Sequence, residues 1–342
     1  MVLSLCACGS GNNAAMAGNG RISIVTTIFP EYDWVMNILG ENPAGAEVTM
    51  LLDNGVDLHS YQPTADDILK ISDCDLFIYV GGESDEWVES TLKEAANKDM
   101  VVINLLEVLG DSVKEEELVE GMQEDEHHDH GDGDEDADED EHHDHGDGDE
   151  DADEHEHEHE EEETEYDEHV WLSLRNASIL VNGISDSLCS IDPDNAGTYR
   201  KNSTAYIEKL NALDDGYKKA AGEASFHTLL FGDRFPFRYM VDDYGLDYYA
   251  AFAGCSAETE ASFETVTFLA QKVDELGLPA VMTIEGTDHR IAETIVQDTK
   301  EKNRKILTLD SMQSTTSGDV QKGVTYLSVM ENNLAVLKEA LN

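Results

Sequence analysis

Residues 21–39 read RISIVTTIFPEYDWVMNIL, and they show the unit from which most of the chain is built. Residues 21–29 are a β-branched run that ends at Pro30, a pattern typical of a buried strand. From residue 32 to residue 39 the apolar side chains recur at helical spacing. A strand followed at once by a helix is the repeating unit of a parallel sheet with helices on its faces.

The same alternation recurs on both sides of an acidic interruption that begins at residue 121. Before it, the sequence predicts strands and helices in turn at 48–52, 65–72, 76–80, 87–96 and 101–105. After it come two predicted helices, at 176–188 and 199–221. The last part alternates again, with predicted strands at 228–231, 248–252, 281–284 and 306–309 and predicted helices at 238–243, 263–276, 291–302 and 320–341.

These elements predict an α/β fold of two lobes with mainly parallel sheets, bridged by a long helix. Ligands of open α/β sheets bind at the carboxyl ends of the strands, so we expect a binding cleft between the lobes. The expected divisions are a signal remnant and tether at 1–20, a first lobe at 21–190 that includes a disordered segment at 121–165, a connecting helix at 191–221, and a second lobe at 222–342.

The charge of the chain narrows the classes of partner. Its 342 residues include 75 Asp and Glu against 21 Lys and Arg, a formal net charge of −54. Such a chain repels nucleic acids and anionic membrane surfaces, and a cation is the natural partner. No apolar run approaches the ~18 residues that indicate a membrane-spanning helix. The sequence therefore predicts no integral membrane protein.

The acidic interruption is a repeat. Residues 126–140 read EHHDHGDGDEDADED, and residues 141–155 repeat them with one change. Such a polar segment cannot bury enough apolar surface to offset its ordering entropy, so a disordered loop is expected. The repeat is either a solvated charge run or a set of weak accessory zinc ligands. Taken together with the His-Glu alternation that runs on to residue 159, the repeat contains nine histidines: His127, His128, His130, His142, His143, His145, His155, His157 and His159.

The five cysteines include no CxxC pair, and this spacing argues against a cysteine-based metal site. They are Cys6, Cys8, Cys74, Cys189 and Cys255. Residues 1–20 change from apolar to rich in Gly, Asn and Ala, which resembles the end of a bacterial lipoprotein signal without its basic start. Cys8 follows a small residue and is the expected lipidation site. Two or more lipid chains there would anchor the protein outside the cytoplasmic membrane.

Four histidines lie outside the repeat. Three of them fall in loops that could line the cleft, namely His59, His169 and His289. Histidine is the commonest metal ligand, although a single loop histidine is more often a hydrogen-bonding surface residue. The fourth, His227, begins a predicted strand and is expected on the surface.

Two of these histidines lie in long motifs, GVDLHSYQPT at 55–64 and DEHVWLSLRNA at 167–177. Together with the opening IVTTIFP at 24–30, they resemble the zinc and manganese solute-binding proteins of ABC importers. A His-rich acidic loop between the motifs marks the zinc-specific branch of that family. The resemblance covers residues 21–342 and implies two α/β lobes, a long bridging helix and one bound Zn²⁺. It makes His59 and His169 the expected ligands from the first lobe.

The second lobe departs from the family pattern. FGDRFPF at 231–237 stands where the family has a third histidine or a Glu, so Asp233 is the nearest substitute, with Arg234 as a competing ion-pair partner. The family's acidic ligand follows a later strand, which makes Glu285 the first candidate, with Asp288 and His289 able to complete the sphere. Two histidines plus a carboxylate suit zinc, and they suit manganese as well.

One more loop of the second lobe bears on the cleft. GCSAETE at 254–260 corresponds to an acidic loop before a helix in the family. Glu258 and Glu260 are expected to cap the helix at 263–276 and to rim the cleft rather than bind metal.

The resemblance implies a monomeric, extracytoplasmic, lipid-anchored protein that captures Zn²⁺ in the cleft and delivers it to an ABC permease and its ATPase. No catalysis is expected. Three alternatives remain open: a Mn²⁺-selective protein of the same type, a surface metal buffer or adhesin that works through the repeat, and a zinc hydrolase. The hydrolase requires a general base, and outside the His-Glu alternation of residues 155–159 the sequence has no HExxH motif to supply one.

Overall fold

The computed structural model describes residues 21–123, 165–256, 260–286 and 288–342. The nine histidines of the repeat, Cys8 and Glu258 lie outside the described residues, so the expectations about them stay predictions. Within the described part of the chain, no helix combines the length and the apolar character that crossing a membrane requires.

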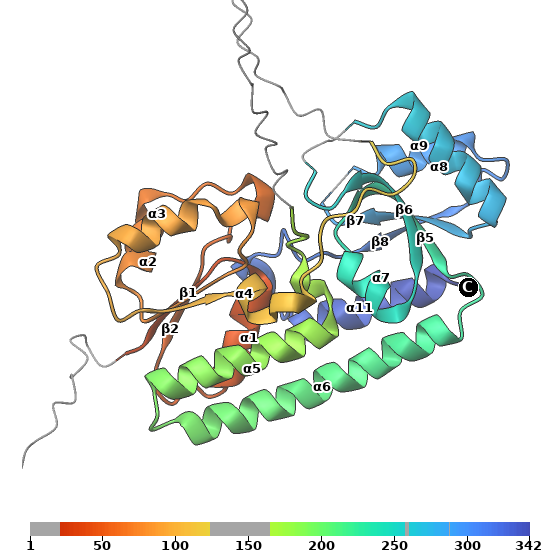
Figure 1. Cartoon of the computed structure of the whole chain (residues 1–342). Coiled ribbons are helices and arrows are strands. Elements are labelled where there is room, and N and C mark those ends of the chain that lie inside the picture. Colours follow the sequence, from red (N-terminus) through yellow and green to blue (C-terminus); the bar gives the residue numbers. More distant parts are fainter. Residues whose placement is uncertain (1–20, 124–164, 257–259, 287) are drawn as a thin grey trace, which may run out of the picture.

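The first lobe is built on a four-stranded sheet in the order β2-β1-β3-β4, with every neighbouring pair parallel. Helix α1 lies on one face of the sheet, and α2 and α3 pack together on the other, as right-handed crossovers require (Figure 1). The elements are β1 (Ser23–Thr26), α1 (Phe29–Leu39), β2 (Glu47–Met50), α2 (Ala65–Asp73), β3 (Leu76–Tyr79), α3 (Trp87–Glu94), β4 (Val101–Asn104) and α4 (Leu105–Leu109).

The turn from β1 into α1 depends on a buried carboxylate. Oε2 of Glu31 accepts hydrogen bonds from the backbone N–H groups of Thr27 (2.8 Å) and Ile28 (3.2 Å). These N–H groups at the start of a helix have no partner within it, and Glu31 supplies one. Burial raises the pKa of Glu31 well above its usual value, and the nearby Asp85 raises it further.

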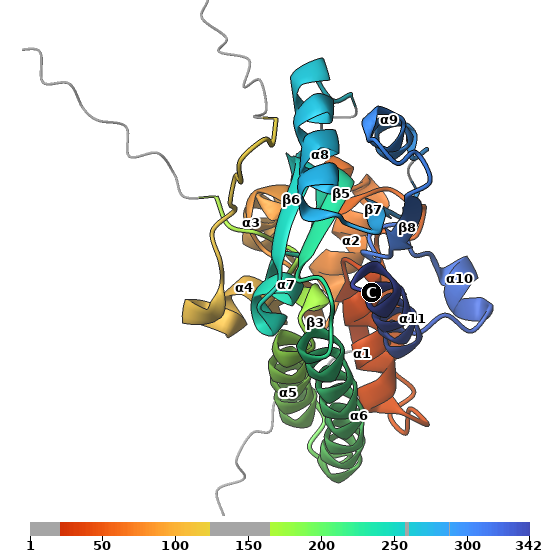
Figure 2. The same cartoon turned by 90° about the vertical axis from the view of Figure 1, so that its right-hand side faces the viewer.

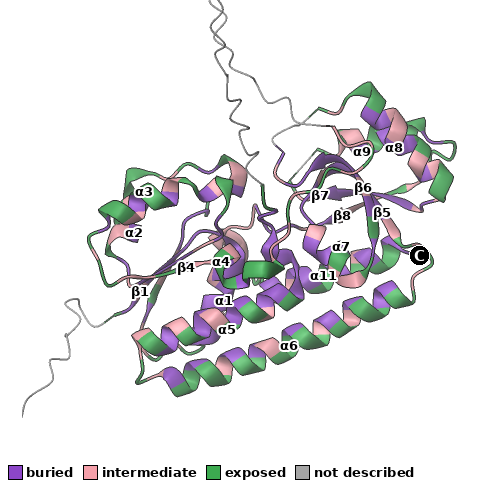
Figure 3. Cartoon of the chain, in the orientation of Figure 1, coloured by how far each residue is buried: buried purple, intermediate pink, exposed green. Residues whose placement is uncertain are grey.

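The second lobe repeats the same topology. Its sheet has the order β6-β5-β7-β8, again with parallel pairs throughout. The central strands β1, β3, β5 and β7 are largely buried, whereas the edge strands β2, β4 and β8 are partly exposed (Figure 3). The elements are β5 (Thr228–Phe235), α7 (Arg238–Tyr244), β6 (Asp247–Ala253), α8 (Phe263–Leu276), β7 (Ala280–Ile284), α9 (Arg290–Asp298), β8 (Lys305–Leu309), α10 (Ser317–Gln321) and α11 (Tyr326–Ala340).

Two long helices connect and support the lobes. Helices α5 (Leu174–Ile191) and α6 (Ala196–Gly222) run side by side, and α6 extends beneath both lobes, as Figures 1 and 2 show. On the first lobe, the Tyr206 hydroxyl of α6 donates to Asp33 of α1 (3.0 Å). Towards the second, the Tyr217 hydroxyl donates to the Met330 carbonyl of α11 (2.7 Å). The predicted architecture of two parallel-sheet lobes and a long helix is confirmed.

Two details differ from the sequence-based expectation. The closing helix predicted at 320–341 is divided into α10 and α11, because Gly323 adopts a φ of +96° and Thr325 starts a new capping box with Ser328. The short helix α4 was not expected. Four 3₁₀ turns complete the described elements: η1 (Leu58–Ser60), η2 (Glu83–Asp85), η3 (Gly110–Ser112) and η4 (Val170–Leu172).

Candidate metal centre

His59 lies in the loop between β2 and α2, on the turn η1. The carboxylate of Asp57 caps this turn by accepting the backbone N–H of His59 (3.0 Å). On the ring, Nδ1 lies 2.8 Å from Oγ of Ser84, which follows β3, and 3.5 Å from a carboxylate oxygen of Glu168. With its proton on Nδ1, His59 presents the lone pair of Nε2 to the cleft.

His169 is held in the same way by Asp167. One carboxylate oxygen of Asp167 accepts the backbone N–H of His169 (2.8 Å) and lies 3.1 Å from Nδ1 of its ring. The ring is fully buried beside Trp171. Both histidines therefore stand in an Asp-x-His arrangement, in which a carboxylate two residues earlier fixes the backbone of the histidine.

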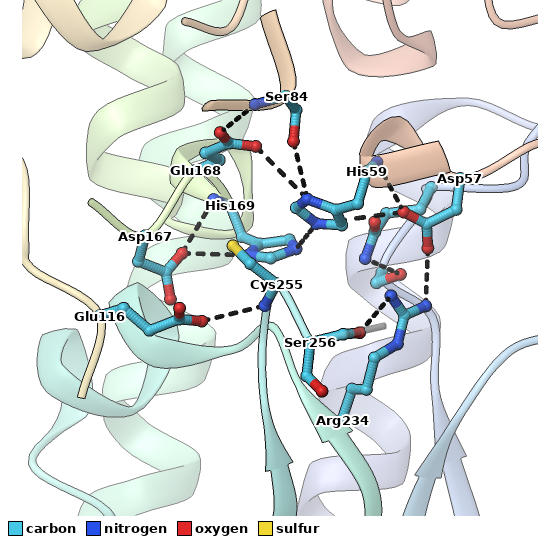
Figure 4. Close-up of polar contacts among 12 residues, drawn as sticks. Asp57, His59, Ser84, Glu116, Asp167, Glu168, His169, Arg234, Cys255 and Ser256 are labelled. Carbon is cyan, nitrogen blue, oxygen red and sulfur yellow. Dashed lines mark hydrogen bonds and ion pairs between the residues drawn. The ribbon is translucent and has the colours of Figure 1, made fainter. Parts of the chain in front are cut away.

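The two imidazoles face each other through their outer nitrogens. Nε2 of His59 lies 3.2 Å from Nε2 of His169 (Figure 4). Burial, followed by the nearness of His169, lowers the pKa of His59 to about 3. Burial also opposes the charged form of His169, but Asp167 outweighs it and the pKa of His169 is raised. A neutral, anchored imidazole with a free Nε2 is the form that binds metals.

The third possible donor in this cluster comes from the second lobe. Cys255 follows β6, and its Sγ and the ring nitrogens of His59 and His169 all lie within 4.8 Å of one another. Its backbone N–H donates to Oε1 of Glu116 (2.9 Å). Burial, followed by the charge of Glu116, raises the pKa of the Cys255 thiol well above its usual value, so without a metal the thiol keeps its proton.

Asp233 does not reach the cluster. It is buried within β5, where its carboxylate accepts the N–H of Arg234 (2.9 Å) and the N–H of Ile284 in β7 (3.2 Å). The neighbouring Gly232 packs so closely on Ala292 that a Cβ would lie 2.6 Å from its Cα. Asp233 and Gly232, at the strand position where the sequence suggested a ligand, thus hold β5 against β7 and α9.

The three candidates that follow β7 also lie outside the cluster. Glu285 accepts the N–H and the hydroxyl of Ser311 (2.6 and 2.7 Å), and burial raises its pKa to about 7. Asp288 is exposed and pairs with Arg290. His289 is the N-cap of α9 with a φ of 58°. Among the described residues, the group of three or more metal-binding side chains consists of His59, His169 and Cys255.

Arg234 closes one side of the centre. Its guanidinium binds Asp57 across the lobes (2.6 Å) and the carbonyl of Ser256 (3.4 Å). Burial would raise the pKa of Asp57, but Arg234 and His59 more than offset this and hold it below its usual value. The amide of Gln313 completes this wall: in the orientation that satisfies both of its ends, its nitrogen donates to Asp57 (2.9 Å) and its oxygen lies 3.3 Å from Nε2 of His169.

The opposite side opens into a cavity of about 250 Å³. Burial raises the pKa of one of its carboxyl groups, Glu168, to about 7. Glu165, at which the described chain resumes after residue 123, also lines the cavity. The lining residues are His59, Glu83, Ser84, Glu116, Glu165, Tyr166, Glu168 and Cys255.

Two further expectations concern His227 and Glu260 of the second lobe. His227 is exposed, as expected of a surface histidine. Glu260 is exposed and does not cap α8, because the hydroxyl of Ser262 accepts the N–H of Thr265 there (3.0 Å). Cys255 was missed by the sequence analysis, which looked for paired cysteines. The available signal was its place directly after a strand, at the carboxyl edge of the sheet.

Known proteins match the chain over almost its whole length. The family ZnuA, zinc-uptake complex component A, periplasmic, matches residues 24–340. The chain is 32% identical to the zinc-binding lipoprotein AdcA of Streptococcus pneumoniae, over 98% of this chain and 58% of AdcA. It is 30% identical to the high-affinity zinc uptake system protein ZnuA of Bacillus subtilis, over 99% and 94% of the two chains.

Solved structures agree with these sequence matches. The Zn(II)-bound ZnuA-like domain of Streptococcus pneumoniae AdcA superposes with a TM-score of 0.67 at 28% identity, covering 94% of this chain and 99% of that domain. The metal-dependent lipoprotein YcdH of Bacillus subtilis gives a TM-score of 0.68 at 26% identity, covering 94% and 99%. The chain spans 58% of the length of the pneumococcal AdcA protein. This chain belongs to the family of the zinc-uptake complex component A.

Proposed function

We propose that this protein is the extracytoplasmic solute-binding component of an ABC metal importer, which captures Zn²⁺ between its lobes and delivers it to a permease and its ATPase. The observation that carries the proposal is the pair of facing Nε2 atoms of His59 and His169. Relatives whose names describe zinc binding and zinc uptake support the choice of metal.

The distance between the two rings suits a shared zinc ion. Two nitrogens bound to tetrahedral zinc at 2.0–2.1 Å lie roughly 3.3 Å apart. The observed separation of the Nε2 atoms is 3.2 Å. Each ring is also anchored through Nδ1, by Ser84 on one side and Asp167 on the other, which is the outer-shell pattern of metal-binding histidines.

The same donors bear on the manganese alternative. Manganese prefers carboxylate and other oxygen ligands, whereas imidazole and thiol donors suit zinc. The cluster in the described part of the chain has two imidazoles and a thiol and includes no carboxylate. This composition favours zinc.

The rest of the proposal concerns how the protein works. We propose a monomer that catalyses no reaction and is anchored to the outer face of the membrane by lipid on Cys8. The acidic repeat would raise the local concentration of cations at the rim of the cavity, with its histidines as weak accessory ligands. Radiolabelled palmitate incorporation in cells tests the anchor, because the label should disappear in Cys8→Ala and persist in Cys6→Ala.

Metal titration tests the central proposal. Residues 21–342 would be titrated with Zn²⁺ and with Mn²⁺ by calorimetry, with the metal content measured independently. A second version replaces residues 124–164 by a linker of about ten Gly and Ser residues. Because Glu116 N–H bonds to the Glu165 carbonyl, the linker must return along residues 117–123, roughly 25 Å at full extension.

One tight zinc site should survive the replacement, should be lost in His59→Ala, and should persist in the matched control His227→Ala. If only weak, multiple binding is found and it disappears with the repeat, the buffer function replaces the importer function. Tight binding that persists in His59→Ala would also contradict the proposal.

A further inference from the structure

We infer that Cys255 is the third protein ligand of the transported metal, so that the second lobe contributes a thiolate to the centre. This inference rests on the proposed function and adds to it the chemical type of the site. Two neutral imidazoles from the first lobe and one sulfur from the second would surround the ion and leave one position for water or a further donor.

The distances in the cluster allow this ligand set. In tetrahedral zinc, a sulfur at about 2.3 Å and a nitrogen at about 2.05 Å lie roughly 3.6 Å apart. Sγ of Cys255 already lies within 4.8 Å of the histidine nitrogens. Each sulfur–nitrogen distance therefore needs to shorten by no more than about 1.2 Å, which a change of the Cys255 side chain and small loop adjustments can supply. Figure 4 shows the sulfur beside the His169 ring.

The backbone around Cys255 is arranged for this approach. A Cβ on Gly254 would lie 2.9 Å from the carbonyl oxygen of Phe235 and 3.1 Å from Cε1 of His169. Only glycine lets the chain pass so close to the imidazole. On the far side, Glu116 holds the Cys255 N–H at 2.9 Å. The loop that contains Gly254 and Cys255 therefore packs against His169 and is hydrogen-bonded to Glu116, in the segment that precedes the acidic repeat.

The other charged groups of the second lobe have different roles. Asp233 binds the backbone of Arg234 and Ile284, and Glu285 binds Ser311. Arg234 brings a positive charge to the cleft, where it pairs with Asp57. Among the residues of the second lobe that the structure describes, Cys255 is the donor within reach of both histidines. The negative charge of its thiolate favours a cation beside this guanidinium.

Binding of Zn²⁺ to Cys255 would release one proton and one water molecule. The thiol of Cys255 releases its proton to solvent, and its sulfur forms a bond to Zn²⁺ in place of a water of the hydrated ion. No oxidant or reductant takes part. Thiolate is a soft ligand that selects zinc over manganese, so we expect the sulfur to widen the gap between the affinities for the two metals.

Cobalt substitution tests the inference directly. Residues 21–342 loaded with Co²⁺ should show a thiolate-to-cobalt charge-transfer band in the near ultraviolet. The band should be absent in Cys255→Ser and Cys255→Ala, and present in Cys189→Ser, a matched control at a buried cysteine whose Sγ lies 3.5 Å from the carbonyl of Ala196. Thermal unfolding of the metal-free variants shows that they fold.

Two further measurements use the same proteins. The ratio of zinc to manganese affinity should fall at least tenfold in Cys255→Ser and stay unchanged in Cys189→Ser. In the unsubstituted protein, Zn²⁺ should protect Cys255 from alkylation, as measured by mass spectrometry of the peptide.

A charge-transfer band that persists in Cys255→Ser, or that is missing from the unsubstituted protein, overturns the inference. Loss of tight binding in His59→Ala with no change of any kind in Cys255→Ser would reject the thiolate and leave the proposed function standing. Tight binding in His59→Ala would reject the proposed function itself.

Discussion

The two lobes share one strand order but hold the residues of the proposed metal site in different ways. In the first lobe, His59 and His169 are each fixed by an Asp two residues earlier in the chain. In the second, Cys255 is held by Glu116, which lies 139 residues away. The same half of the site also contains Arg234, whose partner Asp57 is 177 residues distant.

This difference explains how far each half could be recognised. A residue fixed by its neighbours leaves a continuous motif, and two such motifs pointed to His59 and His169. A residue fixed by a distant part of the chain leaves no motif around it in the sequence. Substitutions that remove the local and the long-range contacts separately test this difference between the lobes.

The largest effect is expected from the first lobe. His169→Ala should lower zinc affinity at least about 1,000-fold, because loss of a ligand must exceed the 10–100-fold cost of losing an outer-shell partner. The matched control is His289→Asn, since Asn tolerates the positive φ at this position. Competition with a chelating dye measures both. Equal losses of zinc affinity in His169→Ala and His289→Asn would contradict the role of His169 as a ligand from the first lobe.

The joint between α6 and the first lobe should give the metal-free protein a pH dependence. Burial raises the pKa of Asp33 to about 6, against 3.8 for an ordinary Asp. The folded protein therefore holds a proton there that the unfolded chain loses, and the resulting stabilisation is complete below pH 3.8 and lost as the pH rises through about 6. The loss is at most about 3 kcal/mol.

Asp33→Asn removes this titration. Urea unfolding at a series of pH values should show the variant gaining stability relative to the unsubstituted protein between pH 4 and pH 7. A difference in unfolding free energy that stays constant over this range would show that Asp33 does not carry the proton.

The supports of the two lobes can be compared directly. Asp167→Ala removes the local support of His169 and should lower zinc affinity 10–100-fold. Glu116→Ala removes the long-range support of Cys255 and should cost about tenfold or less, because the loop is also held by its contact with His169. Calorimetric titration of both variants tests the order, and a larger loss in Glu116→Ala would reverse the comparison.

The smallest effect is expected at the rim, where exposed Asp53 of the first lobe accepts the N–H and the hydroxyl of Ser317 in the second (2.5 and 2.6 Å). Asp53→Ala should lower the free energy of unfolding by about 1 kcal/mol or less, because an exposed polar contact competes with water. Zinc affinity should change less than about twofold. A tenfold change would mean that this contact governs the closure of the lobes.

The α/β class, the two lobes, most of the strands and helices, and the choice of His59 and His169 as a pair could all be predicted from the amino-acid sequence. Each of these depends on periodicity or on contacts within a few residues, which a continuous stretch of sequence contains. The start of the last helix was harder to predict, because the break at Gly323 depends on a single backbone conformation.

Which side chains of the second lobe reach the cleft depends on tertiary packing and could not be predicted from the sequence. Asp233 and Glu285 looked like ligands, but each binds backbone or hydroxyl groups of a neighbouring strand or loop. Cys255 looked incidental, yet the packing of Gly254 against His169 brings it to the histidines. The physical reason is that the position of a donor depends on where the two lobes meet, and this is set by contacts between residues far apart in the sequence, such as Glu116 with Cys255 and Asp57 with Arg234.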